Sequence, residues 1–133
     1  CNVDNVAVSG FPEKGDNTNV FLWGIHMEPA ITNSNNSIAL ILLKAELFDG
    51  DPGTAKYYEY ESSAVRLASC SVAGKNSGAQ SSAKVFQDFQ IPYKMVNPNL
   101  HLRFTITNPT STYAGLNLNV FYTKYGNEPL PDC

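Results

Sequence analysis

The sequence predicts an all-β protein: a single antiparallel β-sandwich, immunoglobulin-like or jelly-roll, with about seven or eight strands. Apolar and polar side chains alternate with a period of two in several short segments, which is typical of strands with one buried face. Turn-forming residues recur about every ten residues between these segments, and no segment keeps a helical period over about three turns. In chain order, the expected strands are 3–8, 18–27, 38–48, 56–60, 64–72, 83–91, 100–107 and 114–125.

The first half of the chain holds the more apolar of these segments. Segment 18–27 is rich in β-forming residues, and Trp23 is flanked there by a leucine and a glycine, so we expect its indole in the core. Segment 38–48 is a longer apolar run that ends at Asp-Gly-Asp-Pro-Gly, a turn-forming sequence. In segment 56–60, three tyrosines fall on both faces of one short strand.

The second half alternates more regularly. In segment 100–107, we expect Leu100, Leu102, Phe104 and Ile106 to face inward and His101, Arg103, Thr105 and Thr107 to face outward. Segment 114–125 repeats this pattern, with Leu116, Leu118, Val120 and Tyr122 opposite Asn117, Asn119, Phe121 and Thr123. Each of these two strands is therefore expected to have one solvent-exposed face, as antiparallel sheets allow. We expect chain breaks at 29–36, 74–82 and 92–99, where proline, glycine, serine and asparagine cluster.

Length and composition predict one domain, residues 1–133, and exclude some function classes. Charged residues make up 16% of the chain, against about 25% in average proteins. Neutral polarity replaces them: 14 Asn, 11 Ser and 8 Thr. The net charge is −3 with nine scattered Lys and Arg, so we expect no nucleic-acid partner, which would need clustered positive charge. The apolar content excludes a disordered tail.

Three cysteines, Cys1, Cys70 and Cys133, leave several arrangements open. A Cys70–Cys133 disulfide would leave Cys1 free for a lipid anchor, whereas a Cys1–Cys133 disulfide would close the domain end to end. Disulfides between terminal cysteines of neighbouring molecules would make a polymer, and all three thiols unpaired would make Cys70 a small apolar side chain. An oxidising, extracytoplasmic location is the favoured interpretation. The longest apolar run is too short for a transmembrane span.

The sequence holds little catalytic or metal-binding chemistry. No nucleophile motif is present, and the two histidines, His26 and His101, are expected to be structural. The carboxylate pairs Glu59/Glu61 and Asp49/Asp51 are the candidates for a small glycoside hydrolase, but so short a chain leaves little room for a deep cleft. We therefore expect a non-enzymatic protein. Asp49 and Asp51 are also candidate calcium ligands without the full EF-hand spacing, and we expect no other cofactor.

The aromatic residues give a weak ligand-binding prediction. Tyr57, Tyr58 and Tyr60 with Glu59 form a short aromatic and polar patch. Such a patch suits a protein interface, which is often rich in aromatic side chains, better than a sugar site. The chain has one glycosylation sequon, Asn35-Asn36-Ser37.

These observations favour a structural or adhesive surface protein: a subunit of a pilus, fibre, virion or cell envelope that acts through self-association or binding to other surface proteins. Low surface charge suits the close packing of copies, because few charges must lose water. An apolar N-terminal strand is a further candidate for donation to a neighbouring sheet. The alternative hypotheses are a glycan-binding, lectin-like module or a surface lipoprotein.

Overall fold

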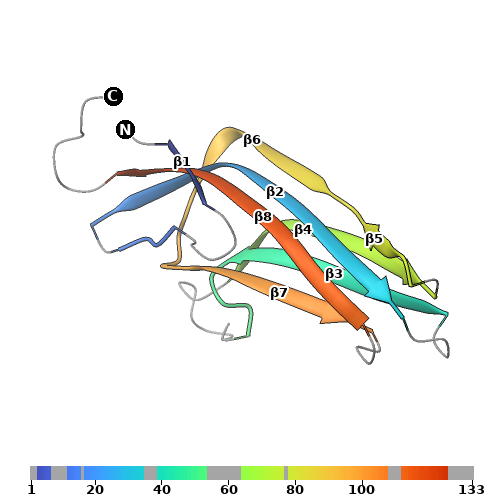
Figure 1. Ribbon diagram of the computed structural model, residues 1–133. Helices are drawn as coiled ribbons and strands as arrows, with labels where there is room; N and C mark the ends of the chain where they lie inside the picture. The colour runs from blue at the N-terminus through green and yellow to red at the C-terminus, as the bar shows by residue number, and fades with distance from the viewer. Residues whose placement is uncertain are drawn as a thin grey trace.

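Two antiparallel sheets pack face to face in the computed structural model, which confirms the predicted β-sandwich (Figure 1). The structure describes residues 3–6, 12–15, 17–34, 39–53, 64–76, 78–107 and 112–125. The larger sheet contains β1 (Val3–Val6), β2 (Asn19–Asn33), β5 (Gln80–Ser82), β6 (Val85–Lys94) and β8 (Thr112–Tyr125). The smaller sheet contains β3 (Leu40–Asp49), β4 (Val65–Lys75) and β7 (Leu100–Ile106).

The strand order is β1-β8-β2 in the larger sheet, and both β5 and β6 pair with the remaining side of β2. β5 and β6 lie end to end along that side of β2, so the larger sheet has four strand positions. The smaller sheet has three strands in the order β4-β3-β7. The long pairing of β2 with β8 forms the centre of the larger sheet. The predicted strand at 56–60 lies outside the described residues.

The core lies between the two sheets. Its fully buried side chains come from alternate positions of the central strands: Val20, Leu22, Ile25 and Met27 of β2, Ala45 and Leu47 of β3, and Leu118 and Val120 of β8. Burial of each large aliphatic side chain stabilises the fold by about 1.5–3 kcal/mol. The alternation predicted for 100–107 is confirmed in direction, although Phe104 is 40% exposed because β7 is an edge strand.

Two of the predicted breaks, at 29–36 and 92–99, begin too early, because each proline lies where pairing with β2 is interrupted. β2 continues through Pro29 to Asn33. The carbonyl of Pro29 accepts a hydrogen bond from the N–H of Ala83, which lies between β5 and β6. The nitrogen of Pro29 points to the same side as this carbonyl, away from β8. Its lack of a hydrogen therefore removes no hydrogen bond between β2 and β8. β6 likewise continues through Pro92, since its residues 89–92 have no partner in the β2 ladder.

The predicted break at 74–82 is also wrong at its start. β4 continues to Lys75, and Gly74 lies in it against Ile31 of the opposite sheet. A Cβ atom on Gly74 would come within 3.0 Å of Ile31 Cγ2. The glycine therefore marks a close approach of the two sheets rather than a loop.

The N-terminal strand β1 pairs with β8 of its own chain, Val3 opposite Thr123. In this structure it completes the edge of the larger sheet of its own chain, and its donation to a neighbouring sheet stays a prediction. The described part of the chain contains no helix long and apolar enough to cross a membrane.

Candidate binding faces

The outer face of the smaller sheet carries a cluster of cations, and we call it the basic face. Side chains of β3 alternate between the core and this face, and the register of β4 and β7 places their outward residues beside them. Its charged residues are Lys44, Glu46, Arg66, Lys75 and Arg103. Three of the cations surround the one carboxylate and Lys75 lies farther along the sheet, opposite Leu40, so these residues have a net charge of +3 in a chain of net −3.

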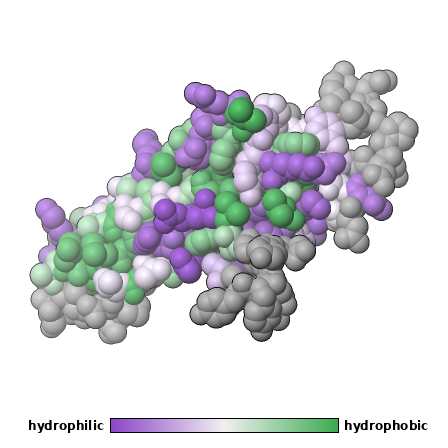
Figure 2. All heavy atoms as spheres, turned by 180° about the vertical axis from the view of Figure 1, so that it is seen from behind, coloured by the Kyte–Doolittle hydropathy of each residue, from purple (hydrophilic) through white to green (hydrophobic). Residues whose placement is uncertain are grey.

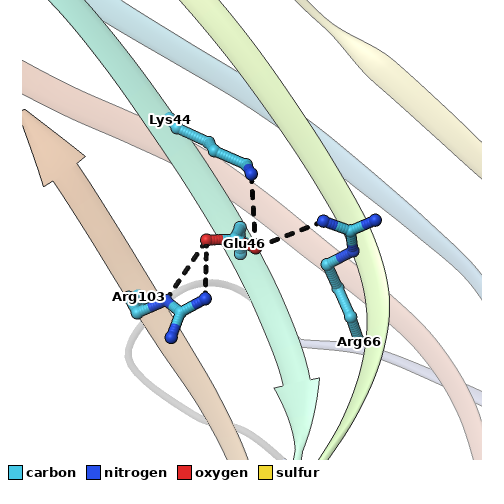
Figure 3. A network of polar contacts seen from close by, with 4 residues as sticks. All are labelled: Lys44, Glu46, Arg66 and Arg103. Carbon is cyan, nitrogen blue, oxygen red and sulfur yellow. Dashed lines mark hydrogen bonds and ion pairs between the residues drawn. The ribbon is translucent and has the colours of Figure 1, made fainter. Parts of the chain in front are cut away.

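Glu46 is the centre of the cluster (Figure 3). Arg103 donates to Glu46 Oε1 from Nη2 at 3.1 Å and from Nε at 3.2 Å. Arg66 Nη1 lies 3.4 Å from Glu46 Oε2, and Lys44 Nζ lies 3.7 Å from the same oxygen. Each of the three strands of the smaller sheet thus supplies a cation to one carboxylate.

The cations keep Glu46 ionised although its side chain is only 4% exposed. Burial by itself raises the pKa of Glu46, but hydrogen bonds from Arg103 and Arg66 and the charges of Arg103 and Lys44 outweigh it and lower the pKa below its usual value. The guanidinium carbon of Arg103 also lies 4.8 Å from the centre of the Phe48 ring, a cation–π contact. Arg103 is therefore held by two neighbours on β3.

A shallow groove of about 420 Å³ runs beside this cluster on the basic face. Leu42 and Lys44 of β3 line it, together with Ser71 and Ala73 on one side and Thr105 and Thr107 on the other. On the basic face, Leu40 is 47% exposed and Leu42, which lines the groove, is 48% exposed. In the view from behind (Figure 2), hydrophobic side chains gather at one end of the molecule, and hydrophilic side chains lie next to them.

The outer face of the larger sheet carries exposed rings, and we call it the aromatic face. The expectation that Trp23 is a core residue is wrong: its side chain is 43% exposed. Trp23 follows the buried Leu22 and points outward. A register shift between Leu22 and Gly24 makes it the extra residue of a β-bulge, after which Ile25 and Met27 point into the core. Its Nε1 donates to Thr123 Oγ1 at 2.6 Å.

More rings and several polar groups share the aromatic face with Trp23. Phe86, which is 60% exposed, lies 6.2 Å from His26 and 6.1 Å from Phe121 between ring centres. The register places on the same face the carboxylates Glu28 and Asp88, the amides Asn117 and Asn119, and two lysines, Lys94 and Lys84, the latter opposite Glu28. Among the described residues, the Glu28 and Asp88 side chains make no hydrogen bond or ion pair, and Asp88 is exposed beside the ring of Phe86.

The predicted calcium ligands have other partners in this structure. Asp49 is fully buried, and its carboxylate accepts hydrogen bonds from Tyr93 Oη at 2.7 Å, Val96 N at 2.8 Å and Asn97 N at 3.1 Å. Asp51 accepts one from Gly53 N at 2.8 Å. A cation at Asp49 would have to displace three donors, and the described residues contain no cluster of three or more metal-ligating side chains. The calcium site stays a prediction.

The other predicted site residues divide into two groups. Tyr57, Tyr58, Glu59 and Tyr60 lie outside the described residues, as do Glu61, Cys1 and Cys133. Cys70 is described: it is a free thiol that packs against the core from β4. Burial raises the pKa of this thiol. The structure thus has Cys70 as a free, half-buried side chain, and the predicted pairings that involve Cys1 or Cys133 fall on residues outside the described ranges.

Sequence reasoning missed both faces. The polar Lys44 and Glu46 within the apolar segment 38–48 are a local signal for an outward face, since they stand two residues apart. Their partners on β4 and β7 depend on strand register, for which the sequence holds no local signal.

No known protein family matches the chain, and no curated protein is significantly similar to it in sequence.

Proposed function

We propose that this protein is a structural or adhesive subunit of an extracytoplasmic assembly, which acts by self-association or by binding other surface proteins. The observation that carries the proposal is that both outer sheet faces expose large apolar side chains, Trp23 and Phe86 on one and Leu40 and Leu42 on the other. Such patches on a folded domain are typical of interaction sites. The low content of charged residues agrees with close packing, because few charges need to be desolvated.

Sedimentation velocity of the purified chain at rising concentration tests self-association. A reductant in the buffer keeps the three cysteines from forming disulfides between molecules. We expect species larger than the monomer to grow with concentration. A single monomer boundary at the highest concentration would contradict self-association and leave binding to a different surface protein as the remaining form of the proposal.

The extracytoplasmic location has its own measurement. Intact mass spectrometry of native material, reduced and unreduced, reports whether Cys1 carries a lipid and whether cysteines are paired. A lipid mass on Cys1 or a disulfide to Cys133 supports export from the cytoplasm. Native material with three unmodified thiols counts against it.

Glycan binding is the second candidate, and the aromatic face favours it. Trp23 and Phe86 offer apolar ring surfaces on which the apolar face of a pyranose packs, and Asp88 and Asn119 offer polar groups for its hydroxyls. Since Trp23 is the sole tryptophan, its fluorescence reports occupancy of this face directly. A glycan array followed by titration of hits tests this role, with Phe86→Ser expected to weaken binding and Leu42→Ser, on the opposite face, expected to leave it unchanged.

A further inference from the structure

We propose that the basic face of one copy packs against the aromatic face of the next, so that copies of this chain associate head to tail. This inference rests on the proposed self-association and names its two surfaces. They belong to opposite sheets of one sandwich, so each copy presents both halves of the contact. A contact between two different surfaces is heterologous and builds rings or open chains rather than closed dimers.

The positive charge of the basic face favours its contact with a different surface of a second copy. The basic face holds Lys44, Arg66, Lys75 and Arg103 against one carboxylate, Glu46, a net charge of +3. Because the whole chain has a net charge of −3, the rest of it carries −6. The side chains of Lys44, Arg66 and Arg103 are each about half exposed, which leaves their charges available to a partner. The basic face therefore attracts other parts of a second copy and repels its own equivalent.

The aromatic face has the matching groups. Glu28 and Asp88 lie on it without an ion pair among the described residues. Its cations are Lys94 and the exposed Lys84, which the shared register of β5 and β6 places opposite Glu28, so the described part of this face carries no net charge. Asp88 stands opposite Gly24 and Phe86 opposite His26 in the ladder between β6 and β2. Asp88 thus lies beside the exposed ring of Phe86 with no cation opposite it in the ladder, and it is the group on this face to which the cations of the basic face can pair.

The shapes of the two faces also match. The basic face is hollowed by the groove over Leu42, between the small side chains of Ser71 and Ala73 and those of Thr105 and Thr107. The aromatic face presents the opposite: Phe86 is 60% exposed, above Gly24, which has no side chain. An aromatic side chain that enters an apolar groove is the usual anchor of a protein interface. Phe86 and Leu42 are therefore the central contact, and the charged pairs surround it.

Paired face variants test the proposal. The basic-face variant combines Leu42→Ser with Lys75→Glu, and the aromatic-face variant combines Phe86→Ser with Asp88→Lys. All four side chains are exposed, so both variants should fold, and circular dichroism melts check this. A control combines Ile91→Ser with Lys14→Glu, the same types of change; Ile91 is 85% exposed in the unpaired part of β6, and Lys14 precedes β2.

Sedimentation velocity under reductant gives the readout. We expect the wild type and the control to form species beyond the dimer, more weakly as salt rises, and each face variant alone to stay monomeric. An equimolar mixture of the two face variants should form a dimer and nothing larger, since each variant retains the face that the other lacks. In that mixture, the fluorescence of Trp23 should shift to the blue and acrylamide should quench it less.

The other possible results would contradict the proposal, and they distinguish the pairing of these two faces from self-association in general. A mixture that stays monomeric, or a single face variant that assembles like the wild type, contradicts the pairing of these faces and leaves self-association intact. A basic-face variant that still forms dimers alone points to a symmetric contact between two aromatic faces. A wild type that is monomeric throughout contradicts both this inference and the self-association on which it rests.

Discussion

Trp23 donates a hydrogen bond from its indole nitrogen to Thr123 Oγ1 at 2.6 Å, and this bond joins β2 to β8 on the outer surface of the larger sheet. Thr123 is only 2% exposed, because it lies next to the ring. Trp23 follows the buried Leu22, so strand alternation directs its side chain to the outer face, where Phe21 stands opposite Thr123. The bond therefore ties the exposed indole to the neighbouring strand of the aromatic face.

Replacement of Thr123 by valine tests that bond. Thr123→Val keeps the shape of the side chain and removes the acceptor, so we expect a loss of about 1 kcal/mol in the free energy of unfolding. Acrylamide should also quench Trp23 more strongly. Thr105→Val, on the exposed face of β7, is the control and should change stability by less than about 0.5 kcal/mol. Equal effects of the two variants would contradict a specific role for the bond.

Asp49 anchors the segment between β6 and β7 to the end of β3, since its carboxylate accepts bonds from Tyr93, Val96 and Asn97. Asp49→Asn removes the charge and turns an amide group toward donors, so we expect a loss of about 3 kcal/mol, measured by urea unfolding. Asp51→Asn retains the oxygen that accepts from Gly53 N and should cost less than about 0.5 kcal/mol. A small effect at Asp49 would show that the anchor is dispensable.

Glu46 makes stability depend on pH at the acid end. Its pKa is lower in the folded chain than its usual value, so the folded state favours the carboxylate. The resulting stabilisation is complete above the unfolded pKa of about 4.3 and is lost as the pH falls through the lower folded value. Glu46→Gln should therefore be less stable than the wild type at neutral pH, and the difference should shrink at pH about 3.

Urea unfolding at both pH values measures this difference. Glu13→Gln, at an exposed position before β2, shows the background effect of removing one carboxylate. A gap between wild type and Glu46→Gln that stays constant from neutral to acid pH would show that the ionised form of Glu46 does not stabilise the fold.

Gly74 and Gly115 give a matched pair of strand glycines. A Cβ atom at Gly74 would lie 3.0 Å from Ile31 Cγ2, whereas one at Gly115 would meet nothing within 4 Å. Gly74→Ala should therefore lower the unfolding free energy by about 1–3 kcal/mol through overpacking. Gly115→Ala should be neutral or raise it by up to about 1 kcal/mol. Thermal melts of both variants decide, and equal shifts would contradict the close approach of the sheets at Gly74.

Cys70 should react slowly with thiol reagents in the folded protein. Its side chain packs against the core, and burial raises its pKa, so little thiolate is present or accessible. Alkylation with iodoacetamide at pH about 8, followed by peptide mass mapping, should label Cys70 much more slowly in buffer than in urea. Equal rates in both would place the thiol on the surface.

Local pattern predicted the strands whose surroundings are regular. The alternation at Leu100 and Leu102 reads correctly because a half-buried strand repeats every two residues whatever it pairs with. Pro29 and Gly74 misled the prediction of strand ends, because their strand-breaking tendency disappears where a neighbouring ladder stops or a facing sheet comes close. The predicted tyrosine patch lies outside the described residues and stays a prediction.

The sequence by itself determined that this chain is a β-sandwich, with alternating strands and few charged residues. Only the tertiary structure decided which side chains share a surface: that β4 and β7 bring Arg66 and Arg103 to Glu46, and that a bulge lets Leu22 and Ile25 both point inward and leaves Trp23 outside. The physical reason is that alternation is a property of one strand. Register, bulges and sheet order depend on the pairing of segments far apart in the chain, and they alone place the basic and aromatic faces on opposite sides of one molecule.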